Sequence, residues 1–172
     1  NKINEFISLD KETSEYLGPN KYGKAWGRKE FLYELKDKWK YSVYSTIDTK
    51  VQGYLITSSY NNKIHAHRLA LKINLSYIQK IKITRALYTN LKTLAKINEI
   101  ECLSAIVPIE NKNTIKFYKQ DGWKELTNNE IDEFIKERNM EAYSKYPNLL
   151  IDKYPVKNDP YISFVLKYFY EY

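Results

Sequence analysis

Two helical patterns of apolar residues open the chain. The first is short, covers residues 10–20 and stops at Gly18-Pro19, a pair that does not continue a helix. The second covers residues 28–38, where Phe31, Leu32 and Leu35 recur at helical spacing. Strand-like runs separated by short turn segments follow at residues 41–47, 51–60 and 63–71. These patterns predict two helices that lead into a three-stranded antiparallel meander.

The rest of the chain alternates between helical and strand periods. Between residues 78 and 97, Ile83, Leu87, Leu91 and Leu94 are spaced to share one face of a long helix. The later elements are predicted as a strand at 100–107, a helix at 110–122, a strand at 123–126, a helix that begins at residue 128 or 129, a loop at 147–160 and a strand at 161–170. A meander that passes through a helix to a neighbouring strand predicts an α/β (α+β) fold with a mixed sheet, as a single domain over residues 1–172.

Length and composition narrow the class of protein. A chain of 172 residues can bury a core, and an aromatic content of 15% argues against disorder. No apolar run approaches the roughly 18 residues of a membrane-spanning helix, and the first residues do not resemble a signal peptide. The single cysteine, Cys102, excludes an internal disulfide and fits a reducing compartment. We therefore expect a cytoplasmic protein that does not bind a membrane.

Positive charge is concentrated in the middle of the chain. The net charge is +7, and no Asp or Glu occurs between Lys50 and Asn98. Such a window is typical of a protein with an anionic partner, such as a nucleic acid, an acidic surface or a phosphorylated small molecule. The alternative is a solvated basic face without a partner.

The start of the long helix lies inside this basic window. The first turn of a helix exposes unpaired N–H groups and a partial positive charge, so basic residues there favour an anion-binding site. The candidate donors are the backbone amides of Ile81, Lys82, Ile83, Thr84 and Arg85.

A second motif, ENKNTIKFYKQDGW, follows the strand at 100–107. Asn111 and Tyr118 lie seven residues apart and share a helix face, and the motif ends with Gly122 and the aromatic Trp123. With the strand HRLAL and the segment Gln79–Thr84, the motif resembles the GNAT superfamily of acyl-CoA-dependent N-acetyltransferases. The second motif is close to the family pattern N-x-x-A-x-x-x-Y-x-x-x-G-F. The first departs from the pattern Q/R-x-x-G-x-G/A, because Lys82 and Thr84 stand where the family has glycine.

The resemblance implies an enzyme that transfers an acetyl group from acetyl-CoA to the amine of a small molecule or peptide, by direct attack in a ternary complex. It implies that the central strands splay around the pantetheine arm, beside Leu69 and Leu71. The Leu71 amide, after a bulge, would bind the acyl carbonyl and the oxyanion. Asn111 would contact the pantetheine or the loop backbone, and Tyr118 would protonate the departing thiolate. The pyrophosphate would be held by Gln79, Lys80, Ile81, Lys82, Ile83, Thr84 and Arg85.

Two histidines are candidates for the base that takes the proton of the attacking amine. His65 and His67 are two residues apart on a predicted strand and therefore share a face. His67 is the preferred candidate, because it lies four residues before Leu71, where many members of the family carry Glu. His65, or no dedicated side chain, is the alternative. No Asp, Glu or Cys lies near the two histidines in sequence, so no metal site is predicted.

The resemblance also places the acceptor beside residues 16–30 and the insertion at 128–160, which is mildly acidic. Two alternatives remain open. One is a GNAT-fold protein with altered or lost CoA binding, since side chains at 82 and 84 would crowd the pyrophosphate. The other is a basic nucleic-acid-binding module, which is the less favoured hypothesis. A homodimer is compatible with the sequence.

Overall fold

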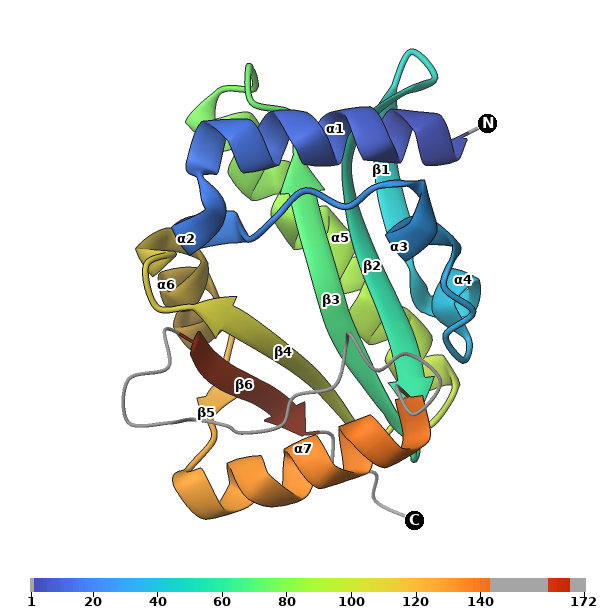
Figure 1. The fold of residues 1–172 in the computed structure, drawn as a ribbon, viewed down its shortest axis with the longest axis vertical. Helices are drawn as coiled ribbons and strands as arrows, with labels where there is room; N and C mark the ends of the chain where they lie inside the picture. Colours follow the sequence, from blue (N-terminus) through green and yellow to red (C-terminus); the bar gives the residue numbers. More distant parts are fainter. Residues whose placement is uncertain (1, 143–160, 168–172) are drawn as a thin grey trace.

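The computed structural model describes residues 2–142 and 161–167 (Figure 1). The helices are α1 (Lys2–Leu17), α2 (Pro19–Tyr22), α3 (Arg28–Leu32), α4 (Lys38–Tyr41), α5 (Tyr77–Ile97), α6 (Lys112–Gln120) and α7 (Asn128–Ala142). The strands are β1 (Val43–Ile47), β2 (Lys50–Tyr60), β3 (Lys63–Leu71), β4 (Cys102–Pro108), β5 (Lys124–Glu125) and β6 (Tyr161–Lys167). No helix in these residues is long and apolar enough to cross a membrane.

In the described residues the strands form a mixed sheet in the order β1-β2-β3-β4-β6-β5. The neighbours are antiparallel except for β3 and β4, which are parallel and are joined through α5. The predicted meander and mostly antiparallel sheet are therefore confirmed. In Figure 1, α5 lies behind the sheet, and α1 crosses in front of β1, β2 and β3.

The parallel pair β3–β4 is joined over only part of its length. The paired residues run from Lys63 opposite Cys102 to Ala66 opposite Ala105. Beyond this point the two strands diverge, because β3 continues toward α1 whereas β4 runs toward α2 and α6 (Figure 1). We call the region beyond Ala66 and Ala105 the fork. The predicted splay of the central strands is thus confirmed.

Two apolar clusters cover the two faces of the sheet. Behind the sheet, α5 and α6 contribute buried residues such as Leu91 and Tyr118, which pack with the back-facing residues of β2, β3 and β4. In front, α1 and α3 contribute Phe6, Leu9 and Phe31. Helix α5 approaches the sheet so closely at Gly53 that an added Cβ would lie 3.1 Å from Cγ2 of Ile83.

Two predicted elements differ from those observed, and two others fall partly or wholly outside the described residues. The helix expected at 10–20 begins at Lys2, because Phe6, Leu9, Asp10 and Thr13 form a buried stripe whose two polar members weaken the apolar pattern. The helix expected at 28–38 is broken into α3 and α4. Lys38 is the first residue of α4, and its Nζ donates back to the carbonyl oxygens of Glu30, Phe31 and Tyr33 at the end of α3. The loop expected at 147–160 and the end of the strand expected at 161–170 lie outside the described residues.

Candidate active site

The fork begins beside an irregularity in β3. In the pairing of β2 with β3, Arg68 is opposite Ile56 and Ala66 is opposite Thr57, so His67 is an additional residue. Such a β-bulge turns consecutive side chains to one face. His67 and Arg68 both contact residues on the front of the sheet, whereas Leu69 and Leu71 pack against the cluster behind it. The bulge expected before Leu71 is therefore present, at His67.

The backbone of β3 beyond the bulge presents N–H groups to the fork. The amide of Lys72 donates to the carbonyl oxygen of Gln52 in β2 at 2.9 Å. Successive amides of a strand point to opposite edges, so those of Leu69 and Leu71 point away from β2 and toward β4. β4 pairs with β3 only as far as Ala66, so these two amides face the fork. This orientation fits donors to a carbonyl oxygen held between the strands.

The two histidines share the front face of β3, as predicted. His67 Nε2 lies 2.7 Å from Oγ of the fully buried Ser58, and His65 Nδ1 lies 3.0 Å from Oγ of Ser104. Their ring centroids are 4.8 Å apart. His65 is only 2% exposed, whereas His67 is half-buried. His67 is therefore the more accessible of the two candidate bases, and it is the first residue of β3 beyond the paired segment.

A buried ion pair fixes the segment that follows α1. Arg68 Nε and Nη2 each donate at 2.9 Å to the carboxylate of Asp10, which is 0% exposed. The Arg68 Nη1 and Nη2 groups also donate to the carbonyl oxygens of Tyr22, at 2.6 Å, and of Lys24, at 2.9 Å. Burial raises the pKa of Asp10, but Arg68 and the other donors overcome this effect and hold the pKa below its ordinary value.

The same segment contacts the other side of the fork. Asn111, the N-cap of α6, accepts from the Thr114 amide at 3.2 Å, and its Nδ2 donates to the Lys21 carbonyl oxygen at 3.3 Å. Residues 21–24 are thus joined to β3 through Arg68 and to α6 through Asn111. They border the fork at its open end, where α2 lies beside α6 in Figure 1.

The start of α5 differs from the predicted anion site. The helix begins at Tyr77 with Ser76 as its N-cap, and Ser76 and Gln79 form a capping box. The amides of residues 81–85 therefore lie inside the helix and donate to carbonyl groups four residues earlier, so they are not free donors as we expected. The amides of Tyr77 and Ile78 occupy the first turn instead. At the two positions where the family pattern has glycine, the side chain of Lys82 is exposed to solvent and that of Thr84 is buried.

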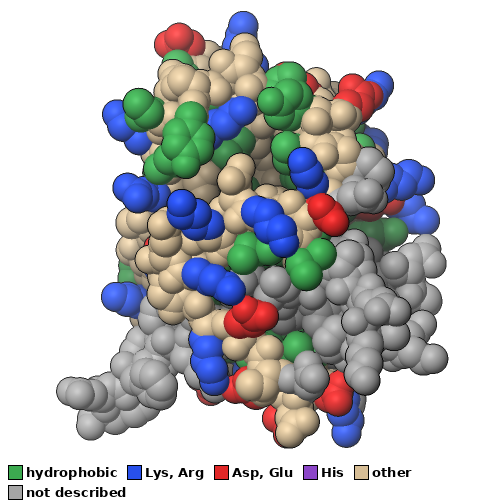
Figure 2. All heavy atoms as spheres, turned by 90° about the vertical axis from the view of Figure 1, so that its left-hand side faces the viewer, with side chains coloured by type: hydrophobic (Ala, Val, Ile, Leu, Met, Phe, Trp, Pro, Cys, Tyr) green, Lys and Arg blue, Asp and Glu red, His purple; other side chains and the backbone are tan. Residues whose placement is uncertain are grey.

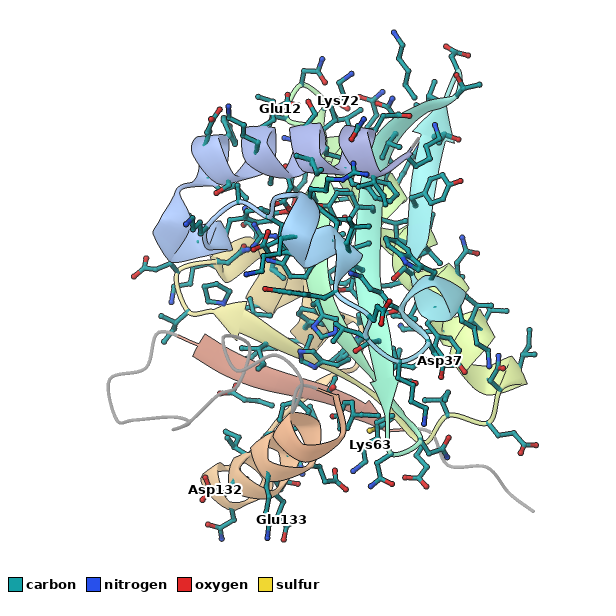
Figure 3. All side chains as sticks on the ribbon, turned by 45° about the vertical axis from the view of Figure 1, so that its right-hand side comes forward. Glu12, Asp37, Lys63, Lys72, Asp132 and Glu133 are labelled. Carbon is teal, nitrogen blue, oxygen red and sulfur yellow. The ribbon has the colours of Figure 1, made fainter. Side chains whose placement is uncertain are left out.

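Positive charge surrounds the open end of the fork. Figure 2, which shows the side of the molecule with α2 and α6, has many Lys and Arg side chains. Exposed lysines next to the fork are Lys21 and Lys24 after α1 and Lys112 and Lys116 on α6. None of these four forms an ion pair within the described residues. In contrast, Asp132 and Glu133 of α7 point away from the sheet (Figure 3).

Tyr118 is buried behind the sheet, in the same cluster as Leu69 and Leu71. Its hydroxyl group hydrogen-bonds to that of Tyr88 on α5, and its ring meets Trp123 at a centroid distance of 4.7 Å. Burial raises the pKa of Tyr118 well above its ordinary value. The phenol is therefore protonated at neutral pH. Nothing in the sequence distinguishes Tyr88 from other tyrosines, because it lies on the core-facing side of an ordinary amphipathic helix.

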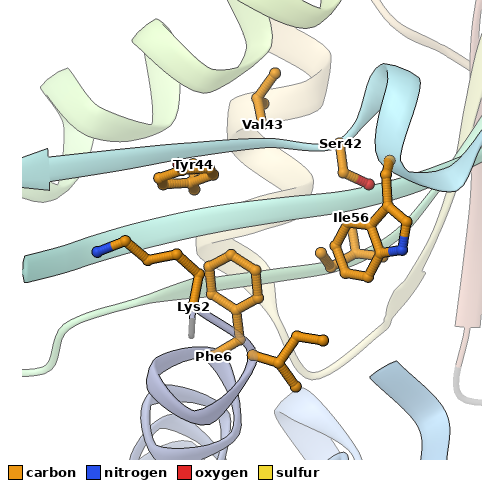
Figure 4. A pocket seen from close by; sticks show the side chains of 8 residues that line it. Lys2, Phe6, Ser42, Val43, Tyr44 and Ile56 are labelled. Atoms are coloured by element: carbon orange, nitrogen blue, oxygen red, sulfur yellow. The ribbon is translucent and has the colours of Figure 1, made fainter. Parts of the chain in front are cut away.

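A cavity of about 310 Å³ lies elsewhere, between α1 and the strands β1 and β2 (Figure 4). Its lining includes Phe6, Val43, Tyr44 and Ile56, with Lys2 at its edge. It is mostly apolar and contains no histidine, and β2 separates β1 from β3. The candidate chemistry is therefore at the fork rather than in this cavity.

Comparisons with known proteins agree with this arrangement. No family model matches the sequence, and no curated protein matches it significantly. Among solved structures, the chain is similar to the ribosomal-protein-S18-alanine N-acetyltransferase of Escherichia coli, with a TM-score of 0.63, 15% identity and coverage of 96% of this chain and 86% of that one. It is also similar to the PaiA N-acetyltransferase of Thermoplasma acidophilum, in complex with coenzyme A, with a TM-score of 0.60, 14% identity and coverage of 97% and 93%.

A third similar solved structure belongs to a named family of acetyltransferases. It is an acetyltransferase of the GNAT family from Staphylococcus aureus, with a TM-score of 0.63, 11% identity and coverage of 96% of this chain and 92% of that one. The protein therefore has the mixed α/β fold of the acetyltransferases. More specifically, it has the GNAT fold, and the predicted resemblance is confirmed at the level of the fold.

Proposed function

We propose that the protein is an N-acetyltransferase that transfers the acetyl group of acetyl-CoA to a primary amine by direct attack. The observation that carries the proposal is the fork. Parallel pairing ends at Ala66, the amides of Leu69 and Leu71 face the open side, and His67 stands at the junction on the front of the sheet. This arrangement offers a slot for an extended acyl donor, with a base on the side from which an amine would approach.

The donor would lie between β3 and β4. The amide of Leu71 would donate to the thioester carbonyl and to the oxyanion that forms when the amine attacks, a contribution of about 3 kcal/mol for one such donor. The phosphates would bind near the first turn of α5 and the exposed lysines at the open end of the fork. The fold neighbour crystallised with coenzyme A supports a ligand of this class.

The proton transfers would use residues on the two faces of the sheet. The attacking amine loses a proton, which His67 takes directly or through water, since imidazole titrates near neutral pH. The C–S bond breaks as the tetrahedral intermediate collapses, and the thiolate takes a proton from Tyr118. Because the amine, thioester and proton donors are held together, binding supplies much of the rate acceleration.

Two measurements test this proposal. Calorimetry with acetyl-CoA should show binding, and release of free thiol should accelerate with at least one member of a panel of small amines, polyamines and peptides. His67→Ala should remove the acidic limb of the pH–rate profile, and Tyr118→Phe should slow the chemical step by about 100-fold. A matched control is Tyr44→Phe, an exposed tyrosine on β1 that should leave both measurements unchanged. No heat at millimolar acetyl-CoA would favour the alternative of a GNAT fold that has lost CoA binding.

A further inference from the structure

Two buried hydroxyl groups connect the helices behind the fork. Tyr88 of α5 is 1% exposed and Tyr118 of α6 is 3% exposed, and their hydroxyl groups form a hydrogen bond. The rings meet edge to face with centroids 5.6 Å apart, and Trp123 packs against both. A phenol held in this way has little freedom to turn, so the partner hydroxyl decides how the Tyr118 proton is directed.

We propose that Tyr88 is a positioning residue for the acid step, which donates its hydroxyl proton to the Tyr118 oxygen while Tyr118 protonates the leaving thiolate. This inference rests on the proposed function. A phenol has one proton to donate, so Tyr118 cannot donate to Tyr88 and to sulfur at once. During protonation of sulfur, the Tyr88–Tyr118 hydrogen bond must therefore run from Tyr88 to Tyr118.

The surroundings of Tyr118 show how this hydrogen bond affects its strength as an acid. Burial and the nearby negative charge of Asp121 raise the pKa of Tyr118, and the hydrogen bond from Tyr88 is the interaction that lowers it. Asp121 is itself held by Lys92 and accepts from Trp123 Nε1 at 2.9 Å. A less acidic phenol is a poorer donor to a thiolate, so loss of the Tyr88 hydroxyl should weaken Tyr118 as an acid.

The balance of the step is simple. The C–S bond of the thioester breaks, sulfur keeps the electron pair, and the Tyr118 O–H proton moves to sulfur. Tyr88 keeps its own proton and stabilises the Tyr118 phenolate by a hydrogen bond. Tyr118 recovers a proton from water when the products leave. The proton lost by the amine goes to His67 or to water and is separate from this exchange.

The test measures how the rate depends on the leaving thiol. Thiol release is followed with hydroxylamine as the acceptor and with acetyl-CoA and analogues whose cysteamine unit is fluorinated, which lowers the pKa of the thiol. An enzyme that protonates the thiolate depends weakly on this pKa, whereas an enzyme without the acid depends on it steeply. Tyr88→Phe, which keeps the ring, should slow thiol release from acetyl-CoA by about 10-fold. Its dependence of the rate on the pKa of the thiol should have a slope between those of wild type and Tyr118→Phe.

A second variant covers the case in which Tyr88→Phe folds poorly. Replacement of Tyr88 by 3-fluorotyrosine keeps the packing and strengthens the donor, so it should make the slope shallower than in wild type. Tyr44→Phe is the control, with an unchanged slope. The inference is overturned if both Tyr88 variants have the wild-type slope, or if Tyr118→Phe also has it, in which case the proposed acid falls too. No thiol release by wild type would instead refute the proposed function itself.

Discussion

Replacement of Arg68 by Met tests the ion pair that fixes the segment beside the fork. The substitution removes the two hydrogen bonds to Asp10 and those to the carbonyl oxygens of Tyr22 and Lys24. It leaves the Asp10 carboxylate buried at 0% exposure without a positive partner. Methionine fills a similar apolar volume, so the change isolates the charge and its hydrogen bonds.

The expected loss of stability follows from the contacts that remain. Breaking a buried pair by removing one partner costs about 3–5 kcal/mol. Asp10 would still accept from the Tyr22 hydroxyl at 2.7 Å and from the Trp26 amide at 2.6 Å, which stabilise the carboxylate. We therefore expect the low end of the range, about 3 kcal/mol, which for a chain of this length lowers the Tm by roughly 6–12 °C.

The loss should depend on pH. In the wild type the pKa of Asp10 is below its ordinary value, so the pair stabilises the fold above that value and is lost as pH falls through the folded-state pKa. In Arg68→Met, the guanidinium that lowers the pKa of Asp10 is absent, so burial of the carboxylate raises this pKa. The unfolded chain then binds fewer protons than the folded one near that pKa, so the variant loses stability as pH rises. The deficit should be larger at pH 7 than at pH 5.

Urea unfolding followed by circular dichroism at the two pH values measures this deficit. Arg28→Met is a matched control, because Arg28 is exposed and its hydrogen bond to Asn4 Oδ1 is long, at 3.4 Å. It should change the free energy of unfolding by less than about 0.5 kcal/mol. A deficit below about 1 kcal/mol for Arg68→Met, or one that is equal at both pH values, would refute the reasoning.

Three further changes test the packing. Burial lowers the pKa of Lys38 from 10.5 to about 8, so between these pH values the unfolded chain binds more protons than the folded one. The free energy of unfolding of the wild type should therefore rise by about 1–2 kcal/mol over that range, and that of Lys38→Met should not. Urea unfolding at about pH 7.5 and 10 measures this difference. Leu91→Ala should cost about 2–5 kcal/mol in the same assay, because Leu91 is 0% exposed on the side of α5 that packs against the sheet. Gly53→Ala should cost about 1–3 kcal/mol, since its Cβ would lie 2.7 Å from Leu71 Cδ2 on β3 and 3.1 Å from Ile83 Cγ2 on α5. Full stability would show that α5 does not pack tightly on β2 at Gly53.

The sequence predicted the elements whose signals are local. The stripe from Ile83 to Leu94 identified α5, and the turns at 48–50 and 61–62 identified the meander. The start of α5 also has a local signal, because Ser76 followed three residues later by Gln79 is a capping-box pattern. The order of elements and the Asn111–Trp123 motif were sufficient for the fold.

Features that depend on distant contacts could not be predicted. The break between α3 and α4 depends on where the Lys38 ammonium finds its acceptors. Asp10 is buried only because Arg68, 58 residues later, pairs with it, and Tyr88 is distinguished from other tyrosines only by Tyr118, 30 residues away. In sequence, each of these residues resembles many others of its type.

The central claim is that an acyl donor binds in the fork, and hydrogen-exchange mass spectrometry with and without acetyl-CoA tests it most directly. Protection on adding the ligand should appear in peptides that contain residues 67–72 of β3, the first turn of α5 and the start of α6. Peptides from β1 and the first half of α1 should exchange at the same rate in both conditions. Unchanged exchange at millimolar acetyl-CoA, or protection confined to the cavity beside β1, would contradict the account.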